Sequence, residues 1–186
     1  MRRIAIVLLC FVAVVIVLTG CGNSEPLEDA KPLEANGYST NYHQYMWTRV
    51  GTTESESISE SSYQYKDSDA FFAIVRISAE TAKAQGLVTP ESMETLLMTY
   101  VANYNGTDQK ITPADNDLEY IRELTFVYDD HDMDEEYTYL AKLVLNKESG
   151  EMMVVLAAYP SKSDTLLKNE VELIMNDAVM GEIVTV

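Results

Sequence analysis

Hydrophobic and polar positions alternate along this 186-residue chain with two different periods. From Thr89 to Gly106 the apolar residues recur every three or four positions, which is the period of a helix that buries one face. Thr89 is the predicted N-cap, Pro90 suits the first helical position, and Gly106 follows the expected end. The predicted buried stripe consists of Met93, Leu96, Leu97, Tyr100, Val101 and Tyr104.

A second helix is predicted near the C-terminus, beginning at Ser163 as its N-cap and ending near Gly181. Its pattern places four apolar side chains on one face, namely Leu167, Val171, Ile174 and Ala178. Two such amphipathic helices are enough to cover both faces of a sheet.

Other segments show the period of two that is typical of strands. A first strand is predicted around residues 45–50, and further strands at 70–78, 120–128, 137–146 and 151–159. The segment 151–159 is apolar on both faces, so we expect a central strand that is covered on both sides. The sequence between the last two strands, KESG, predicts a hairpin turn with a glycine at its tip.

These elements follow one another in the order ββαβββα, which predicts an α+β domain with an antiparallel sheet and helices packed on it. The serine- and glutamate-rich run at 52–62 contains Ile58 as its only core-type residue, so we expect it to form a mobile connection.

The N-terminus has the composition of an export signal. Arg2 and Arg3 precede the unbroken apolar segment 4–18, which is shorter than the roughly 20 residues of a membrane-spanning helix. The next residues, Leu18-Thr19-Gly20-Cys21, resemble the lipobox of bacterial lipoproteins. The resemblance implies a diacylglycerol on the Cys21 thiol and cleavage before this residue. The alternative is an uncleaved N-terminal membrane helix with an incidental cysteine.

The predicted organisation is a signal peptide at 1–20, a flexible acidic tether at 21–37 and a single α+β domain at 38–186. Cleavage would leave 166 residues (186 less 20). The chain has two cysteines, Cys10 in the leader and Cys21 at the lipidation site, so none would remain for a disulfide, a thiolate nucleophile or a zinc site.

The formal net charge of −17 limits the classes of partner. Nucleic-acid binding needs clustered lysine and arginine, so it is disfavoured. The same charge opposes docking on anionic lipid. We therefore expect attachment to the cell membrane through the lipid anchor, with the domain on the extracytoplasmic side.

The segment from 120 to 180, which contains YLAKLVLNKESGEMMVVLAAYPSKSDTLLKNEVELIMNDAVM, resembles the fold shared by PsbP-like photosystem subunits, the Ran-binding nuclear import factor and DcrB-type bacterial lipoproteins. Members of that group mostly act as binding or assembly modules. The resemblance implies a closing hairpin followed by a long final helix. It assigns no catalytic or ligand-binding residue in this chain.

The chain has few groups for catalysis. It contains two histidines, His43 and His131, and no phosphate-binding glycine loop or Gly-x-Ser-x-Gly motif. We therefore expect no enzyme activity, no cofactor, no catalytic residue and no metal ligand.

One cluster, DDHDMDEE from Asp129 to Glu136, contains carboxylates of the kind that bind Ca²⁺. An EF-hand would need glycine where Glu135 stands and glutamate where Ala141 stands, so the pattern favours a solvated hairpin loop.

The predicted function is a binding or scaffolding module for an unidentified envelope or extracellular protein or a small ligand. One alternative is a cell-envelope enzyme that uses carboxylate- or metal-assisted hydrolysis at 129–136. Another is an accessory solute-binding lipoprotein, although 166 residues (186 less 20) are few for the two-lobed type.

Overall fold

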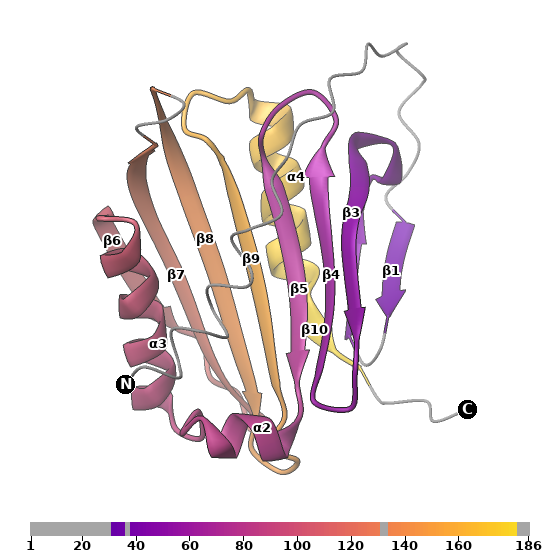
Figure 1. Ribbon diagram of the computed structural model, residues 1–186, viewed down its shortest axis with the longest axis vertical. Helices are drawn as coiled ribbons and strands as arrows, with labels where there is room; N and C mark the ends of the chain where they lie inside the picture. Colours follow the sequence, from indigo (N-terminus) through magenta and orange to yellow (C-terminus); the bar gives the residue numbers. More distant parts are fainter. Residues whose placement is uncertain (1–30, 36–37, 131–133, 182–186) are drawn as a thin grey trace.

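Seven antiparallel strands form one sheet in the order β3-β4-β5-β9-β8-β7-β6 (Figure 1). The computed structural model describes residues 31–35, 38–130 and 134–181. The strands of this sheet are β3 (Trp47–Glu54), β4 (Ile58–Tyr65), β5 (Phe71–Ile77), β6 (Thr107–Pro113), β7 (Glu119–Asp130), β8 (Glu135–Asn146) and β9 (Met152–Pro160). The predicted antiparallel α+β architecture is confirmed at this level.

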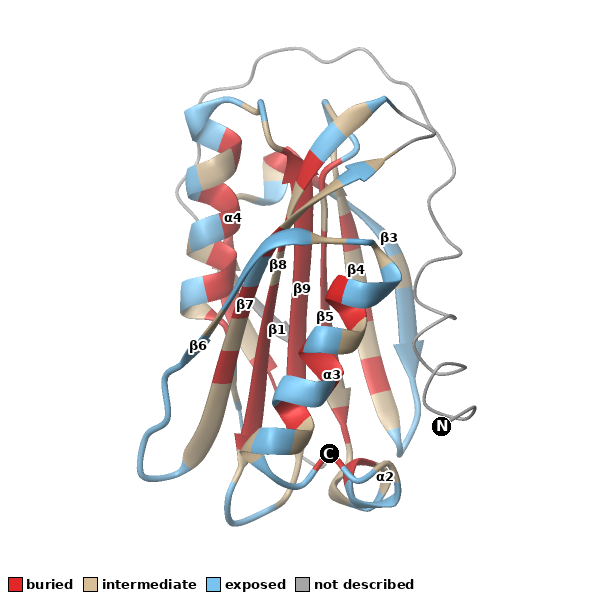
Figure 2. Cartoon of the chain, turned by 90° about the vertical axis from the view of Figure 1, so that its left-hand side faces the viewer, coloured by how far each residue is buried: buried red, intermediate tan, exposed pale blue. Residues whose placement is uncertain are grey.

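Strand β9 lies in the middle of the sheet, between β5 and β8, and all nine of its residues are buried. Helix α3 (Pro90–Asn103) covers one face of the sheet and α4 (Thr165–Asp177) covers the other (Figure 2). The apolar sides of both helices are buried against the strands. The expectation of a central strand covered on both sides is therefore correct.

Helix α3 begins and ends as its sequence predicts. The Thr89 hydroxyl accepts a hydrogen bond from the Ser92 backbone at 3.3 Å, and the Ser92 hydroxyl accepts one from the Thr89 backbone at 3.1 Å. The short helix α2 (Ala79–Ala84), which was not predicted, precedes it. Beyond α3, a Cβ atom on Gly106 would lie 2.4 Å from the Phe126 ring, so glycine allows the chain to pass.

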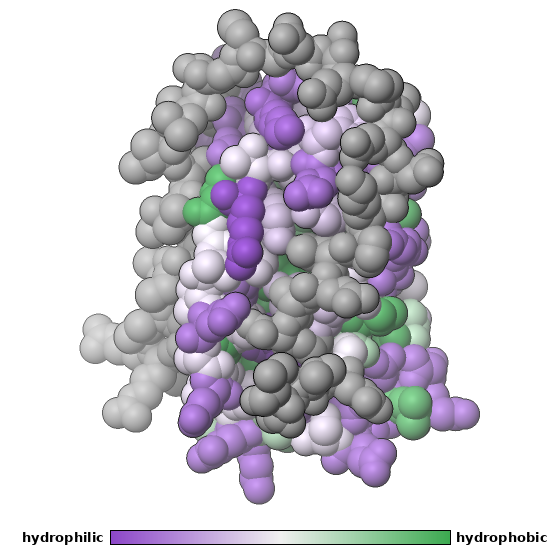
Figure 3. Space-filling view, turned by 90° about the vertical axis from the view of Figure 1, so that its right-hand side faces the viewer, coloured by the Kyte–Doolittle hydropathy of each residue, from purple (hydrophilic) through white to green (hydrophobic). Residues whose placement is uncertain are grey.

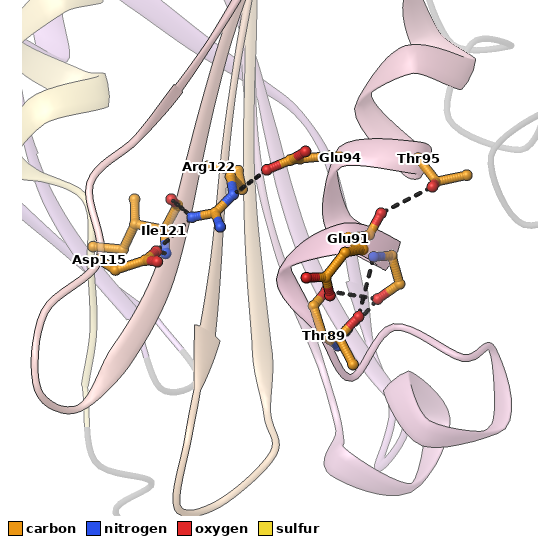
Figure 4. Close-up of polar contacts among 8 residues, drawn as sticks. Thr89, Glu91, Glu94, Thr95, Asp115, Ile121 and Arg122 are labelled. Carbon is orange, nitrogen blue, oxygen red and sulfur yellow. Dashed lines mark hydrogen bonds and ion pairs between the residues drawn. The ribbon is translucent and has the colours of Figure 1, made fainter.

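Arg122 on β7 ties α3 to the sheet (Figure 4). Its guanidinium donates to Glu94 of α3 at 2.8 Å and to Asp115 in the β6–β7 connection at 2.5 Å. Burial lowers the pKa of Arg122, but the hydrogen bonds and charges of these two carboxylates outweigh it and leave the pKa raised. The guanidinium is almost completely buried and pairs with both carboxylates.

A second, smaller sheet contains β1 (Lys31–Ala35), β2 (Tyr38–Tyr42) and β10 (Val179–Met180) in the order β1-β2-β10. Strand β2 contacts α4, where Thr40 donates to the Ile174 carbonyl and Asn41 donates to Asp177, both at 2.8 Å. Strand β1 lies inside the range 21–37 that was expected to form a tether, so strand pairing already begins at Lys31.

The prediction of a mobile connection at 52–62 is wrong, because this run forms much of the β3–β4 hairpin. In β4 the buried positions are Ser59, Ser61 and Tyr63, so two small hydroxyl residues occupy places that apolar residues usually fill in a half-buried strand. Strand β3 is an edge strand with mostly exposed side chains, and its side of the domain is mainly hydrophilic where described residues are visible (Figure 3).

Three further boundaries differ from the prediction. The single first strand is instead β2, a 3-10 turn η1 (Gln44–Met46) and then β3. The N-cap of α4 is Asp164 and not Ser163, because the Asp164 carboxylate accepts the Leu167 backbone N–H at 2.9 Å. The edge strand β6 was not predicted. None of the helices in the described part of the chain is long and apolar enough to cross a membrane.

Candidate functional site

The predicted lipidation site, Cys21, lies outside the described residues. Of the acidic cluster 129–136, residues 129–130 end β7 and residues 135–136 begin β8, whereas 131–133, including His131, also lie outside the described residues. Across the hairpin, Asp129 lies opposite Glu136 and Asp130 opposite Glu135. Within the described ranges, no three His, Cys, Asp or Glu side chains are grouped so that they could hold a metal ion.

Three tyrosines lie directly beside this hairpin end, and we call Tyr104, Tyr128 and Tyr137 the tyrosine cluster. Tyr128 and Tyr137 are cross-strand partners on β7 and β8, and their rings stack with centroids 5.5 Å apart. Tyr104 is the C-cap of α3, and its ring lies 4.9 Å from that of Tyr128. The strand register and the end of α3 therefore bring the three rings together.

Nearby carboxylates affect the pKa of the phenols in this cluster. Burial, followed by the charges of Asp69, Glu135 and Asp130, raises the pKa of Tyr137 to about 12. Burial and then Asp130 raise the pKa of Tyr104. We call Asp69, Asp130 and Glu135 the acidic rim, since their field reaches these phenols from the β4–β5 turn and the β7–β8 hairpin.

A buried carboxylate lies on the opposite face of the sheet. Glu170 of α4 is 3% exposed and accepts three hydrogen bonds, two from His43 in the connection between β2 and β3 and one from Trp47 at the start of β3. The His43 backbone N–H and the Trp47 indole N–H donate to Oε1 at 2.8 and 3.1 Å, and His43 Nδ1 lies 2.5 Å from Oε2. This arrangement attaches α4 to the η1 turn.

The contact with Glu170 fixes the orientation of the His43 imidazole ring. With Nδ1–H directed at a carboxylate, Nε2 is the nitrogen that remains to accept a proton, as in hydrolase triads. The side chain of His43 is 27% exposed. The Tyr45 ring packs edge-on against it at 5.8 Å, and the Tyr45 hydroxyl is buried without a hydrogen-bond partner in the described structure. The same contacts also serve as a structural link, because both Glu170 oxygens are occupied.

Lys142 is a second buried ionic group on this face. Its Nζ donates to the carbonyls of Met175 and Ala178 at 3.0 and 3.1 Å, at the C-terminal end of α4. Burial lowers the pKa of this amine, against the raising effect of nearby carboxylates such as Glu123. A cation at the negative end of a helix dipole satisfies carbonyls that have no partner within the helix.

The sequence pattern did not lead us to Glu170 or Lys142, although both are charged residues within an apolar pattern. Glu170 lies three residues after Leu167 and four before Ile174, so the helical period places it on the buried face. Lys142 interrupts the apolar half of strand β8. A charged residue in a buried pattern is rare unless it is paired, which makes both positions candidates for polar partners.

No family model matches the chain, and no curated protein sequence matches it. The PsbP-like resemblance therefore stays a prediction. Among solved structures, one similar fold is that of LpqN, which is involved in cell envelope biogenesis of Mycobacterium tuberculosis. The match has a TM-score of 0.42 and 11% sequence identity, and it covers 83% of this chain and 91% of that chain.

Proposed function

We propose that the protein is an exported lipoprotein, anchored to the cell membrane through Cys21, whose α+β domain is a binding or scaffolding module on the extracytoplasmic side. The observation that carries the proposal is the sequence Leu18-Thr19-Gly20-Cys21 directly after a basic pair and a short apolar segment. Two or more acyl chains on one residue give stable membrane attachment.

The arrangement of the most buried ionic groups supports a module over a hydrolase. Glu170 and Lys142 direct their polar atoms at backbone or side-chain partners within the domain. Arg122 likewise joins α3 to the β6–β7 connection. These groups hold elements of the domain together and leave none of their polar atoms directed at an outside substrate.

The anchor is tested by membrane fractionation of the full chain expressed in a bacterium. Wild-type protein should remain with membranes after a high-salt wash and should incorporate a labelled fatty acid. Cys21→Ala should lose the label, whereas Cys10→Ala is the matched control and should keep it. Equal labelling of wild type and Cys21→Ala would contradict the proposed attachment site.

The binding role is tested by cross-linking the lipidated protein in intact membranes. A discrete cross-linked envelope or extracellular partner, lost when the domain is removed and the anchor kept, is the expected result. Recovery of the same cross-links with the anchor alone would contradict a role for the domain.

A further inference from the structure

A buried phenol without a partner lies where β2 packs on the β3–β4 hairpin, on the α4 face of the sheet. Tyr42 of β2 contacts Tyr63 of β4 there, with ring centroids 5.6 Å apart. Tyr38 lies four residues earlier on the same side of β2 and is 2% exposed. Its hydroxyl is buried and has no hydrogen-bond partner in the described structure. Such a hydroxyl lowers stability, so it indicates a role that phenylalanine could not fill.

Two further donors, the Ser61 hydroxyl and the Arg49 guanidinium, lie beside this phenol. Arg49 is opposite Tyr63 in the β3–β4 register, and its side chain extends along the hairpin. Its Nη2 donates to Thr52 Oγ1 at 2.5 Å and to Ser61 Oγ at 3.5 Å. Burial raises the pKa of Tyr38, whereas the Ser61 hydroxyl and the Arg49 charge lower it, which places both groups close to the phenol.

These three groups supply more donors than the domain supplies acceptors. Arg49 forms no ion pair within the described residues, and its Nε and Nη1 donate no hydrogen bond there. Ser61 Oγ accepts from Arg49, which leaves its own proton for another acceptor. Glu60 and Glu54 raise the pKa of Tyr38 through their charge, yet neither side chain accepts a hydrogen bond from these donors in the described structure. Convergent donors that include a guanidinium match a carboxylate, which can accept two parallel bonds from arginine.

A small cavity continues the site along β4. Its volume is about 70 Å³, and its walls include Ser57, Ser59 and the Arg76–Glu151 ion pair. Ser59 lies on the same side of β4 as Ser61, opposite Arg76 of β5. The side chains of Ser57 and Ser59 make no hydrogen bond within the described residues, so their hydroxyls can pair with polar groups in the cavity. At roughly 10 to 15 Å³ for each water-sized group, the cavity holds about five of them, which limits the ligand to a small molecule.

We propose that this site binds a small hydroxy acid, with its carboxylate held by Arg49, Ser61 and Tyr38 and its hydroxyl groups against Ser57 and Ser59. This inference rests on the proposed function, because it gives the extracytoplasmic binding module a class of ligand. The net charge of −17 opposes the approach of an anion, so the affinity depends on these short-range contacts. We expect a dissociation constant in the millimolar range.

The test titrates the full chain in an uncharged detergent with glycerate at constant salt and follows the arginine side-chain N–H signals by NMR. Saturable binding that shifts the Arg49 signal is expected. Propionate lacks the hydroxyl groups and should bind more weakly, and glycerol lacks the carboxylate and should not bind. Equal affinities for glycerate and propionate would overturn the proposal, as would glycerol binding as tight as that of glycerate.

Tyr38→Phe separates a binding role of the hydroxyl from a structural one. It should weaken glycerate binding about tenfold, because one hydrogen bond to a charged acceptor is lost. It should leave the melting temperature unchanged or raise it, since the hydroxyl has no partner in the fold. An undiminished affinity together with a lower melting temperature would overturn the proposal.

Arg49→Gln should abolish glycerate binding, and Lys110→Gln is the charge-matched control. Lys110 is exposed on the edge strand β6, at the other edge of the sheet from Arg49 (Figure 1), so its removal should leave binding unchanged. Equal weakening by both variants would overturn the proposal, because it would show charge attraction without a site. Cys21→Ala should bind glycerate like wild type, so failure of this site and failure of the lipid anchor give different results.

Discussion

Glu170, on the buried face of α4, accepts hydrogen bonds from His43 before β3 and from Trp47 at the start of β3. The sequence could place its Cα on that face, because Leu167 and Ile174 mark the helical period. Its partners could not be predicted, since His43 and Trp47 lie 127 and 123 residues earlier in the chain. Their proximity depends on how the small sheet packs on the helix.

Glu170→Gln should lower the free energy of unfolding by about 1 to 3 kcal/mol, because hydrogen bonds to a charged acceptor are stronger than those to a neutral amide. Denaturant unfolding followed by circular dichroism measures the change. Glu172→Gln, an exposed position on the same helix, is the control and should alter stability by less than about 0.5 kcal/mol. Equal stability of Glu170→Gln and wild type would show that the carboxylate charge does not contribute to the free energy of unfolding.

At the scale of helices and strands, the sequence pattern predicts α3 but not β4. The apolar stripe on α3 predicted the buried residues of this helix, because apolar residues that recur with the helical period share one face, and that face packs on the sheet. Strand β4 was missed because Ser59 and Ser61 occupy its buried positions, so its alternation is not one of apolar and polar residues. Ser61 lies close to the buried Tyr38 of β2.

Leu97→Ala should reduce the free energy of unfolding by about 2 to 5 kcal/mol, since Leu97 is fully buried between α3 and the sheet and its loss leaves a cavity. Thermal and denaturant unfolding of a soluble form lacking the first 30 residues would measure it. Met98→Ala is the matched control, because Met98 lies on the same helix with 41% of its surface exposed. A similar loss in both variants would mean that α3 does not pack on the sheet through Leu97.

At the scale of the whole molecule, tyrosines are buried on both faces of the sheet. Tyr63 and Tyr137, on opposite faces, both have pKa values raised to about 12, mainly by burial. Burial also raises the pKa of three others, Tyr100, Tyr128 and Tyr139. Composition alone could not show this, because 12 tyrosines in a sequence can equally lie on a sheet surface.

These pKa values predict alkaline unfolding. An unfolded tyrosine titrates near pH 10, so between about pH 10 and 12 the unfolded state loses protons that the native state keeps. The stability that these groups contribute is complete below pH 10 and is lost as the pH rises. Lys142 acts in the opposite direction, because burial lowers its pKa, but it is one group against several.

We expect the free energy of unfolding to fall by a few kcal/mol per pH unit, with about 1.4 kcal/mol from each tyrosine that titrates only after unfolding. Tyrosinate absorbance and circular dichroism should then change together. Full ionisation of the tyrosines at pH 11 with an intact circular dichroism spectrum would contradict their burial.

The central claim, a lipid-anchored extracytoplasmic protein, is tested most directly by intact-mass and N-terminal peptide mass spectrometry of the protein purified from membranes. The account predicts a chain that begins at Cys21, with acyl mass on this residue and residues 1–20 removed. Detection of a chain that begins at Met1 with a free Cys21 thiol would contradict it and would favour the uncleaved membrane helix.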